Sequence, residues 1–192
     1  MILLIAVLAG LMAALVRARL TGRRLRSIQL NHWWLVVVAF IPQLVAFGPW
    51  ARSNPLPEAW LPPLLLVSQA LLLLFAWFNR SQSGFWCLGF GLLLNFLVIL
   101  LNGGAMPISP ETARRMLPDA PQGAWQVGER FGYTKDRVLT ADTTRLAFLS
   151  DRFVLPGGII EPVAFSMGDV FIAVGAFWLL WSLADPQPTP GS

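Results

Sequence analysis

Charged residues are scarce in this chain. Only 12% of its 192 residues are Asp, Glu, Lys or Arg, against roughly 25% in an ordinary soluble domain. Hydrophobic residues make up 56%, and the mean hydropathy is +0.62. A water-soluble domain of this length has too little interior to bury so much apolar surface. The composition therefore predicts an integral membrane protein.

Cysteine and histidine are almost absent. Cys87 is the only cysteine, which excludes an intramolecular disulfide and cysteine-based metal or redox motifs. His32 is the only histidine, which excludes multi-histidine zinc sites and most catalytic triads. The chain also lacks phosphate-loop, serine-hydrolase, metalloprotease and dinucleotide signatures. We therefore expect no metal and no cofactor, and the sequence favours a non-enzymatic protein.

Apolar residues gather in five runs. At about 1.5 Å per residue, runs of roughly this length approach the ~30 Å thickness of a bilayer's hydrocarbon core. We predict an all-α membrane bundle of five spanning helices, a partly helical external loop at residues 102–165, and a disordered Pro-rich tail at 184–192. Residues 1–183 would form a single membrane domain, with spans at about residues 2–18, 33–50, 60–78, 85–101 and 167–183.

Tryptophan and proline support these boundaries. Pro42 lies near the middle of the second run and predicts a kink, whereas Pro62 and Pro63 fall in the first turn of the third, where missing amides cost little. Indole rings favour the interface between hydrocarbon and water. Eight of the nine tryptophans lie at predicted helix ends: Trp33, Trp34, Trp50, Trp60, Trp77, Trp86, Trp178 and Trp181.

Arginine predicts the orientation. A basic cluster directly follows the first apolar run, a position typical of a cytoplasmic loop that meets anionic lipid headgroups and not of a nucleic-acid interface. Basic and acidic residues balance in the 102–165 loop, which gives no competing signal. We predict a multipass plasma-membrane protein with its N-terminus outside and its C-terminus in the cytoplasm. The cluster consists of Arg17, Arg19, Arg23, Arg24 and Arg26.

The 102–165 loop contains two predicted helix starts. Ser109 followed by Pro110 is typical of an N-cap and a first helical residue, and a second helix is predicted from Thr140. At the start of the loop, Asn102 and Gly103 indicate a helix end with left-handed glycine. The alternative for that glycine segment is a backbone loop that binds a ligand.

Two acidic residues, Asp151 in the loop and Asp169 just beyond it, have two interpretations each. Asp151 is expected to form salt bridges with Arg145, Arg152 or other loop arginines, although a carboxylate pair with Asp142 or Glu161 is the alternative. Ser166 and Asp169 have the spacing of a capping box at the start of the fifth run. Asp169 could instead bind a cation or carry protons.

A few polar and small residues interrupt the apolar runs. Asn95, Gln43, Ser68 and Gln69 are expected either to form hydrogen bonds between helices or to line a polar path for a substrate. In the first run, small residues spaced four apart at Ala6, Gly10 and Ala14 permit close helix packing.

Three segments resemble the motifs of a known family. They are NGGAMPISP at residues 102–110, RLAFLSD at 145–151 and FSMGD at 165–169. Their order is similar to that in a bacterial family of multipass membrane proteins catalogued as a domain of unknown function (family 5317). The family has glycine at the position of Ser150, which puts a tight turn there in doubt.

The resemblance implies that the three motifs belong to one structural unit on the external face. It brings no activity with it. The leading interpretation is therefore an accessory or scaffold subunit with membrane-protein partners. The alternatives are a small transporter or substrate-binding membrane subunit, and an enzyme acting at the outer interface. The candidate site residues are Asn102, Gly103, Met106, Pro107, Asp151, Ser166, Gly168 and Asp169.

Overall fold

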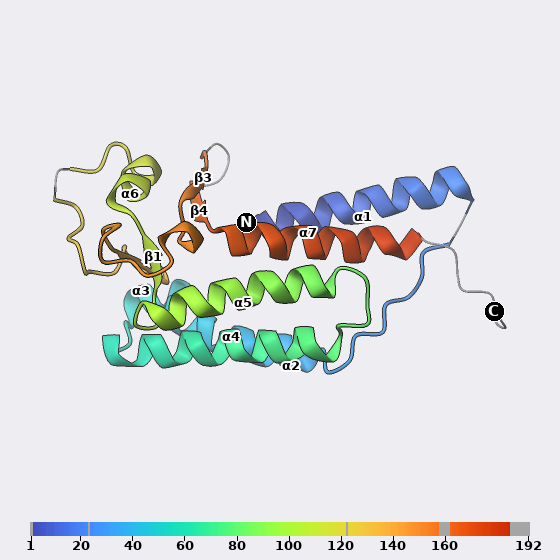
Figure 1. Cartoon of the computed structure of the whole chain (residues 1–192), viewed down its shortest axis with the longest axis horizontal. Coiled ribbons are helices and arrows are strands. Elements are labelled where there is room, and N and C mark those ends of the chain that lie inside the picture. Colours follow the sequence, from blue (N-terminus) through green and yellow to red (C-terminus); the bar gives the residue numbers. More distant parts are fainter. Residues whose placement is uncertain (1, 23, 122, 158–161, 185–192) are drawn as a thin grey trace.

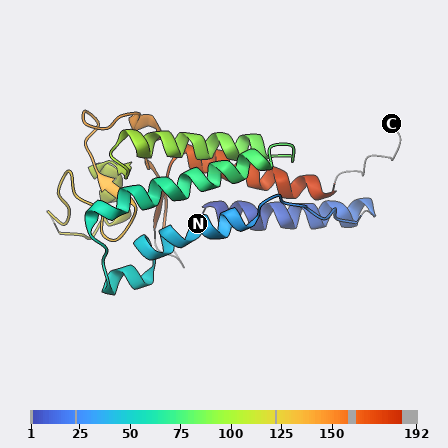
Figure 2. The same ribbon diagram turned by 90° about the horizontal axis from the view of Figure 1, so that it is seen from below.

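Long apolar helices form the body of the molecule. The structure is a computed structural model that describes residues 2–22, 24–121, 123–157 and 162–184. Both views show the long helices running along the longest axis, with the smaller elements beyond one end of them (Figure 1, Figure 2). The prediction of a helical membrane protein is confirmed. The long helices are α1 (Ile2–Thr21), α2 (Trp34–Phe47), α4 (Leu61–Phe78), α5 (Phe85–Leu101) and α7 (Met167–Trp181).

Four helical segments have the length and hydropathy needed to cross a bilayer. They are Ile2–Thr21, Trp34–Ser53, Glu58–Phe78 and Met167–Ala184. The fifth predicted span coincides with α5, which is apolar but has 17 residues and is therefore shorter than the others. The described part of the structure thus contains four helical segments that could cross a membrane, and the count of five spans stays a prediction.

The second predicted span differs from the structure. Instead of one helix, it contains α2 and the short α3 (Pro49–Ser53), separated by an extended Gly48 with φ −73° and ψ 175°. Pro49 explains the break, because a residue that precedes proline is pushed out of the helical region. Pro42, by contrast, lies inside α2 without ending it.

The other helix ends agree closely with the sequence. α4 begins with Pro62 and Pro63 in its first turn after the 3₁₀ turn η1 (Glu58–Trp60), and α7 continues into η3 (Ser182–Ala184). The tryptophans at these ends lie on the surface, between 38% and 69% exposed. This distribution suits side chains that meet a membrane interface. The predicted tail lies outside the described residues from 185 onward.

The long helices pack in the order α1, α7, α5, α4, α2. Small residues allow the closest approaches in this row. Gly10, Ala14 and Ala18 form the buried face of α1, and a Cβ atom at Gly10 would lie 3.1 Å from the Phe177 backbone of α7. The predicted close packing is confirmed at Gly10 and Ala14, while Ala6 is only partly buried.

Two glycine pairs bring the backbones of α5 and α7 into contact. A Cβ atom at Gly84 would collide with the carbonyl oxygen of Gly175, and one at Gly91 would collide with that of Gly168. Gly84 and Gly91 are seven residues apart, as are Gly168 and Gly175 on the antiparallel partner. A residue with a side chain would not fit at these contacts. We call these four residues the glycine seam.

The described residues between α5 and α7 form a small folded unit, which we call the cap. Two parallel strands pair Met106 with Asp136 and Ile108 with Val138, and an antiparallel pair joins Phe153 to Phe165. The sequence predicted none of these strands. The cap contains β1 (Met106–Ile108), α6 (Pro110–Met116), β2 (Asp136–Val138), η2 (Ala147–Leu149), β3 (Phe153–Leu155) and β4 (Val163–Phe165).

One of the two helices predicted for the cap is correct. The Ser109 side chain accepts a hydrogen bond from the Thr112 amide at 3.0 Å and caps α6, as expected. The helix predicted from Thr140 is wrong. Both the amide and the hydroxyl of Thr144 donate to the Thr140 carbonyl, and Leu146 has a left-handed φ of 54°, so the segment forms a turn and then η2.

Candidate functional site

Lys135 lies at the centre of the cap's charged groups. Its ammonium nitrogen is 2.7 Å from Oδ2 of Asp151 and 3.2 Å from Oδ1 of Asp136. The side chain of Asp151 is 1% exposed, whereas that of Lys135 is 37% exposed. Asp151 reaches this position because its amide donates to the Pro107 carbonyl at 3.0 Å and so fixes the chain beside β1. The Asp151 side of this ion pair is therefore buried, and the Lys135 side is partly exposed to water.

Burial and charge act in opposite directions on this pair. Removal from water lowers the pKa of the Lys135 ammonium, but the negative charges of Asp136, Asp151 and Asp169 outweigh it and raise that pKa above its ordinary value. Burial raises the pKa of Asp151 to about 7, although the Lys135 charge opposes it. Lys135 therefore stays a cation, while burial makes the Asp151 carboxylate easier to protonate than an ordinary one.

The partners of Asp151 differ from the prediction. The arginines expected to pair with it make other contacts: the Arg145 backbone is bound by Asn102, and the Arg152 guanidinium lies over the Phe153 ring. Asp151 instead uses Lys135, and its second oxygen, Oδ1, is buried without a hydrogen-bond partner among the described residues. The alternative, a carboxylate pair of Asp151 with Asp142 or Glu161, is not seen among the described residues. Asp142 is exposed, a hydrogen bond from Thr140 lowers its pKa, and Glu161 lies outside the described residues.

Asn102 and Gly103 join the end of α5 to the cap. The Asn102 side chain donates to the Arg145 carbonyl and accepts from the Arg145 amide, both at 2.9 Å. Gly103 has the predicted left-handed φ, at 73°. Beyond it, Met106 is fully buried against Val98 and Leu149, so it packs the cap onto α5.

The start of α7 forms the predicted capping box. The Ser166 hydroxyl accepts from the Asp169 amide, and the Asp169 carboxylate accepts from the Ser166 amide, both at 3.0 Å. Asn95 of α5 completes the network: its amide donates to Asp169 at 2.9 Å and its oxygen accepts from Ser166 at 2.8 Å. A side chain at Gly168 would collide with Asn95. These contacts confirm the hydrogen bonding between helices that was one of two interpretations of Asn95.

The candidate residues thus lie in two groups. Asn102, Gly103, Met106, Pro107 and Asp151 organise the cap, and Ser166, Gly168 and Asp169 organise its junction with α5 and α7. The charges of Asp169, Lys135 and Asp151 interact, which couples the groups. Ser150 fits without strain, because its backbone is extended at φ −66° and ψ 168°.

Sequence reasoning missed Lys135 and Asp136. One signal was present, since Lys135 is the chain's only lysine and every other basic residue is arginine. A single lysine in so arginine-rich a chain indicates a position that needs the compact ammonium of lysine, because the planar guanidinium of arginine has a different shape.

A pocket opens where the cap meets α2. Its volume is about 540 Å³, and Gln43 lines it while donating a 2.6 Å hydrogen bond to Ser68 of α4. This bond confirms the interhelical role expected for Gln43 and Ser68. In the described part of the chain, no cluster of His, Cys, Asp and Glu is suited to hold a metal ion. The pocket is lined by Phe40, Gln43, Leu44, Phe47, Gly48, Arg52, Tyr133, Thr134 and Lys135.

A family model matches residues 27–181, a region that contains the pocket, the cap and every candidate residue. Its description is a family of unknown function, DUF5317. The chain belongs to this family. No curated protein and no solved structure matches the chain.

Membership in DUF5317 agrees with the resemblance noted in the three motifs. The matched region begins after α1 ends, so the part shared with the DUF5317 model starts in the loop before α2. Both the Lys135 network and the glycine seam lie within it. The functional question for this DUF5317 member therefore concerns the cap and the helices α2 to α7.

Proposed function

We propose that the protein is a non-enzymatic, substrate-binding membrane subunit that holds an anionic amphiphile in the pocket between α2 and the cap. The observation that supports this proposal is a pocket whose lining combines two cations, Arg52 of α3 and Lys135 of the cap, with apolar side chains of α2. Its volume falls within the range of roughly 300–1,000 Å³ that small-molecule sites occupy.

The two walls have different chemistry. Phe40 and Leu44 come from the apolar α2 and are 53% and 51% exposed, so they offer surface to a hydrocarbon tail. Thr134 and Lys135 belong to the cap and Arg52 to α3, where water and headgroups are expected. A ligand with an apolar tail and a phosphate or carboxylate head satisfies both walls.

Arg52 is the cation most open to such a ligand. Among the described residues, no carboxylate lies within 4 Å of its guanidinium, whereas Lys135 already faces Asp151 and Asp136. An anion in the pocket would therefore neutralise Arg52 first. Lys135 would add a second favourable charge, weakened by its two carboxylates.

This proposal includes a membrane orientation. We infer that α5 spans the bilayer with the other four segments, that the cap is external, and that the N-terminus is outside and the C-terminus cytoplasmic in the plasma membrane. Arg17, Arg19, Arg24, Arg26 and Arg80 lie in the segments at the end away from the cap, as the positive-inside rule requires of a cytoplasmic end.

Thermal unfolding of the detergent-purified protein tests the pocket. Dihexanoyl phosphatidic acid at a hundredfold excess over its dissociation constant should stabilise the protein by about 2.7 kcal/mol. The same concentration of dihexanoyl phosphatidylcholine should have a much smaller effect. Arg52→Gln should strongly reduce the difference, and Arg145→Gln, which changes a cap arginine outside the pocket, should preserve it. Equal stabilisation by both lipids, or an unchanged response in Arg52→Gln, would overturn the proposal.

A second candidate function is the accessory or scaffold subunit. It is favoured by α1, which among the long helices packs chiefly on α7 and exposes Leu4, Leu8 and Met12 to its surroundings. Such a helix face accepts lipid or a partner helix equally well. Purification in mild detergent followed by native mass spectrometry distinguishes them: a stoichiometric protein partner supports the scaffold, and a monomer at every concentration opposes it.

An enzyme at the outer interface has less support. Asp151 is paired with Lys135 and its side chain is only 1% exposed, and Asp169 is held in the capping box with Asn95. A general acid or base needs a free position beside its substrate. We therefore do not propose a reaction.

A further inference from the structure

We propose a second lipid site at the opposite end of the molecule, independent of the pocket at α2. A groove between α4 and α5 would hold one acyl chain of an anionic phospholipid, with the lipid phosphate bound to Arg80.

The groove is almost wholly apolar. It has a volume of about 500 Å³, with aromatic walls formed by Trp77, Trp86 and Phe90. Trp86 is 69% exposed and Phe90 is 48% exposed, so these rings stand out from the helices. Ala76 and Gly89 also line the groove, and their small side chains leave it hollow. Its shape and chemistry suit a hydrocarbon chain.

Arg80 provides a fixed cation at the mouth of the groove. Its guanidinium lies 4.3 Å from the Trp77 ring centroid and donates to the Trp77 carbonyl at 2.9 Å, so the side chain is held in place. Among the residues that the structure places, no acidic side chain comes within 4 Å of it. An uncompensated guanidinium with free donors is a good ligand for a phosphate group.

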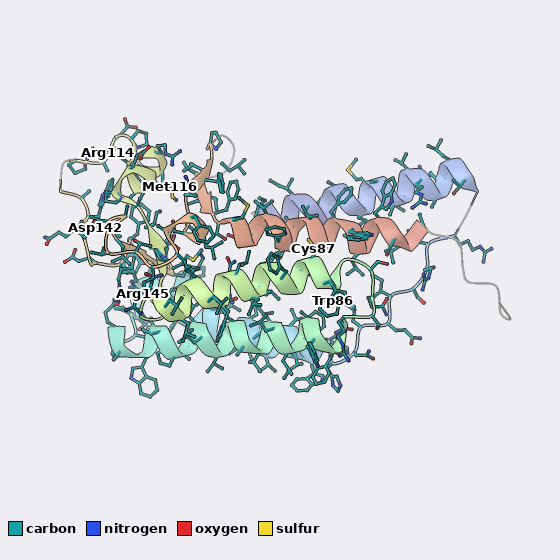
Figure 3. The ribbon with its side chains drawn as sticks, in the orientation of Figure 1. Trp86, Cys87, Arg114, Met116, Asp142 and Arg145 are labelled. Atoms are coloured by element: carbon teal, nitrogen blue, oxygen red, sulfur yellow. The ribbon has the colours of Figure 1, made fainter. Side chains whose placement is uncertain are left out.

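The position of the groove identifies its occupant. Trp86 lies at the end of α5 remote from the cap, whereas Asp142 and Arg145 lie in the cap (Figure 3). That remote end also carries Arg17 and Arg19 of α1, and such clusters attract anionic lipid. The groove opens between two apolar helices, so a ligand reaches it from the hydrocarbon and not from water. A phospholipid meets the apolar groove and the cation together.

Lipid binding measured by native mass spectrometry tests this site. The protein, delipidated in detergent, would be titrated with palmitoyl-oleoyl phosphatidylglycerol and separately with the corresponding phosphatidylcholine. The wild type should bind a first phosphatidylglycerol about tenfold more tightly than phosphatidylcholine. Arg80→Gln added to an Arg52→Gln background, in which the pocket at α2 barely discriminates, should remove that preference. Arg52→Gln, which changes the pocket at α2, should retain it, so failure here and failure of the proposed function can be told apart.

A second variant tests the groove itself. A Cβ atom at Gly89 would meet only the Ala76 Cβ, at an ordinary 3.4 Å, so Gly89→Leu fills the groove while the helices keep their packing. Its first phosphatidylglycerol should bind at least tenfold more weakly, with a thermal midpoint close to that of wild type. Equal binding of both lipids by the wild type, or a preference unchanged when Arg80→Gln is added to Arg52→Gln, would overturn the proposal even if Gly89→Leu failed to fold.

Discussion

The helices and the cap are held together by different means. Between α5 and α7, glycine pairs bring two backbones into contact, and side-chain hydrogen bonds are few. In the cap, the Asn102 side chain binds the Arg145 backbone, and Lys135 pairs with Asp151, whose amide donates to Pro107 of β1. The contrast reflects the expected solvents: among lipid tails, helices associate by close packing, whereas a small unit facing water gains from a satisfied polar network. Each region should therefore be destabilised by a different kind of substitution.

The most damaging change to the cap should be Lys135→Met. It leaves the buried Asp151 carboxylate without its cation, and breaking a buried ion pair costs about 3–5 kcal/mol. The lower end, about 3 kcal/mol, is expected because Lys135 is 37% exposed. Chemical denaturation at pH 8 measures the loss. The double variant Lys135→Met with Asp151→Leu should recover much of it, and a double variant as unstable as the single one would contradict the role of the pair.

Lowering the pH should reduce the loss of stability caused by Lys135→Met. Burial raises the pKa of Asp151 to about 7 from an ordinary 3.8, so between these values the folded protein holds a proton that the unfolded chain has released. This contribution to stability is complete below pH 3.8 and disappears as the pH rises through 7. Without the ammonium, the pKa of Asp151 rises further and protonation relieves the unpaired charge.

Denaturation of the wild type, Lys135→Met and Asp151→Asn at pH 5 and pH 8 tests this linkage. Relative to Asp151→Asn, the wild type should be more stable at pH 5 than at pH 8. The cost of Lys135→Met should also be smaller at pH 5. A wild type that gains stability over Asp151→Asn as the pH rises would show instead that pairing outweighs burial.

The helices should be destabilised most by substitutions in the glycine seam. Gly91→Ala places a methyl group against the Gly168 carbonyl and the Ile172 amide, and overpacking of this kind costs about 1–3 kcal/mol. Gly89→Ala is the matched control, two residues away on α5 and in open contact with Ala76 only. Thermal unfolding in detergent should separate the two variants by several degrees. Similar midpoints would show that the seam does not hold α5 to α7.

A smaller loss is expected between α2 and α4. Ser68→Ala removes the hydroxyl that accepts the 2.6 Å hydrogen bond from Gln43, and such bonds contribute about 0.6 kcal/mol in membranes. A double-mutant cycle with Gln43→Leu should give a coupling free energy of this size. Coupling above about 2 kcal/mol would mean that polar bonds, and not packing, dominate the helices as well.

Local signals in the sequence predicted the helices well. The bounds of α5, the N-cap of α6 and the capping box of α7 all depend on residues within a few positions of one another. The prediction failed at Thr140, where hydroxyl groups compete with the helix for the same carbonyl.

The candidate site could be predicted only in part. Its individual residues were visible as motifs, but their partners were not. Lys135 and Asp151 are 16 residues apart, and β1 pairs with a strand that begins 30 residues after it, so no local pattern joins them. The pocket depends on α2 meeting the 133–135 segment, which is a contact between distant parts of the chain.

The comparison between the two regions depends on α5 crossing the bilayer, with the cap on the outer side. Single cysteines in a Cys87→Ser background test this directly, at Ser83 before α5 and at Thr143 in the cap, both of them exposed. A membrane-impermeant maleimide added to intact cells should label Thr143→Cys at once and Ser83→Cys only after permeabilisation. Equal labelling of both positions in intact cells, or protection of Thr143→Cys, would contradict the account.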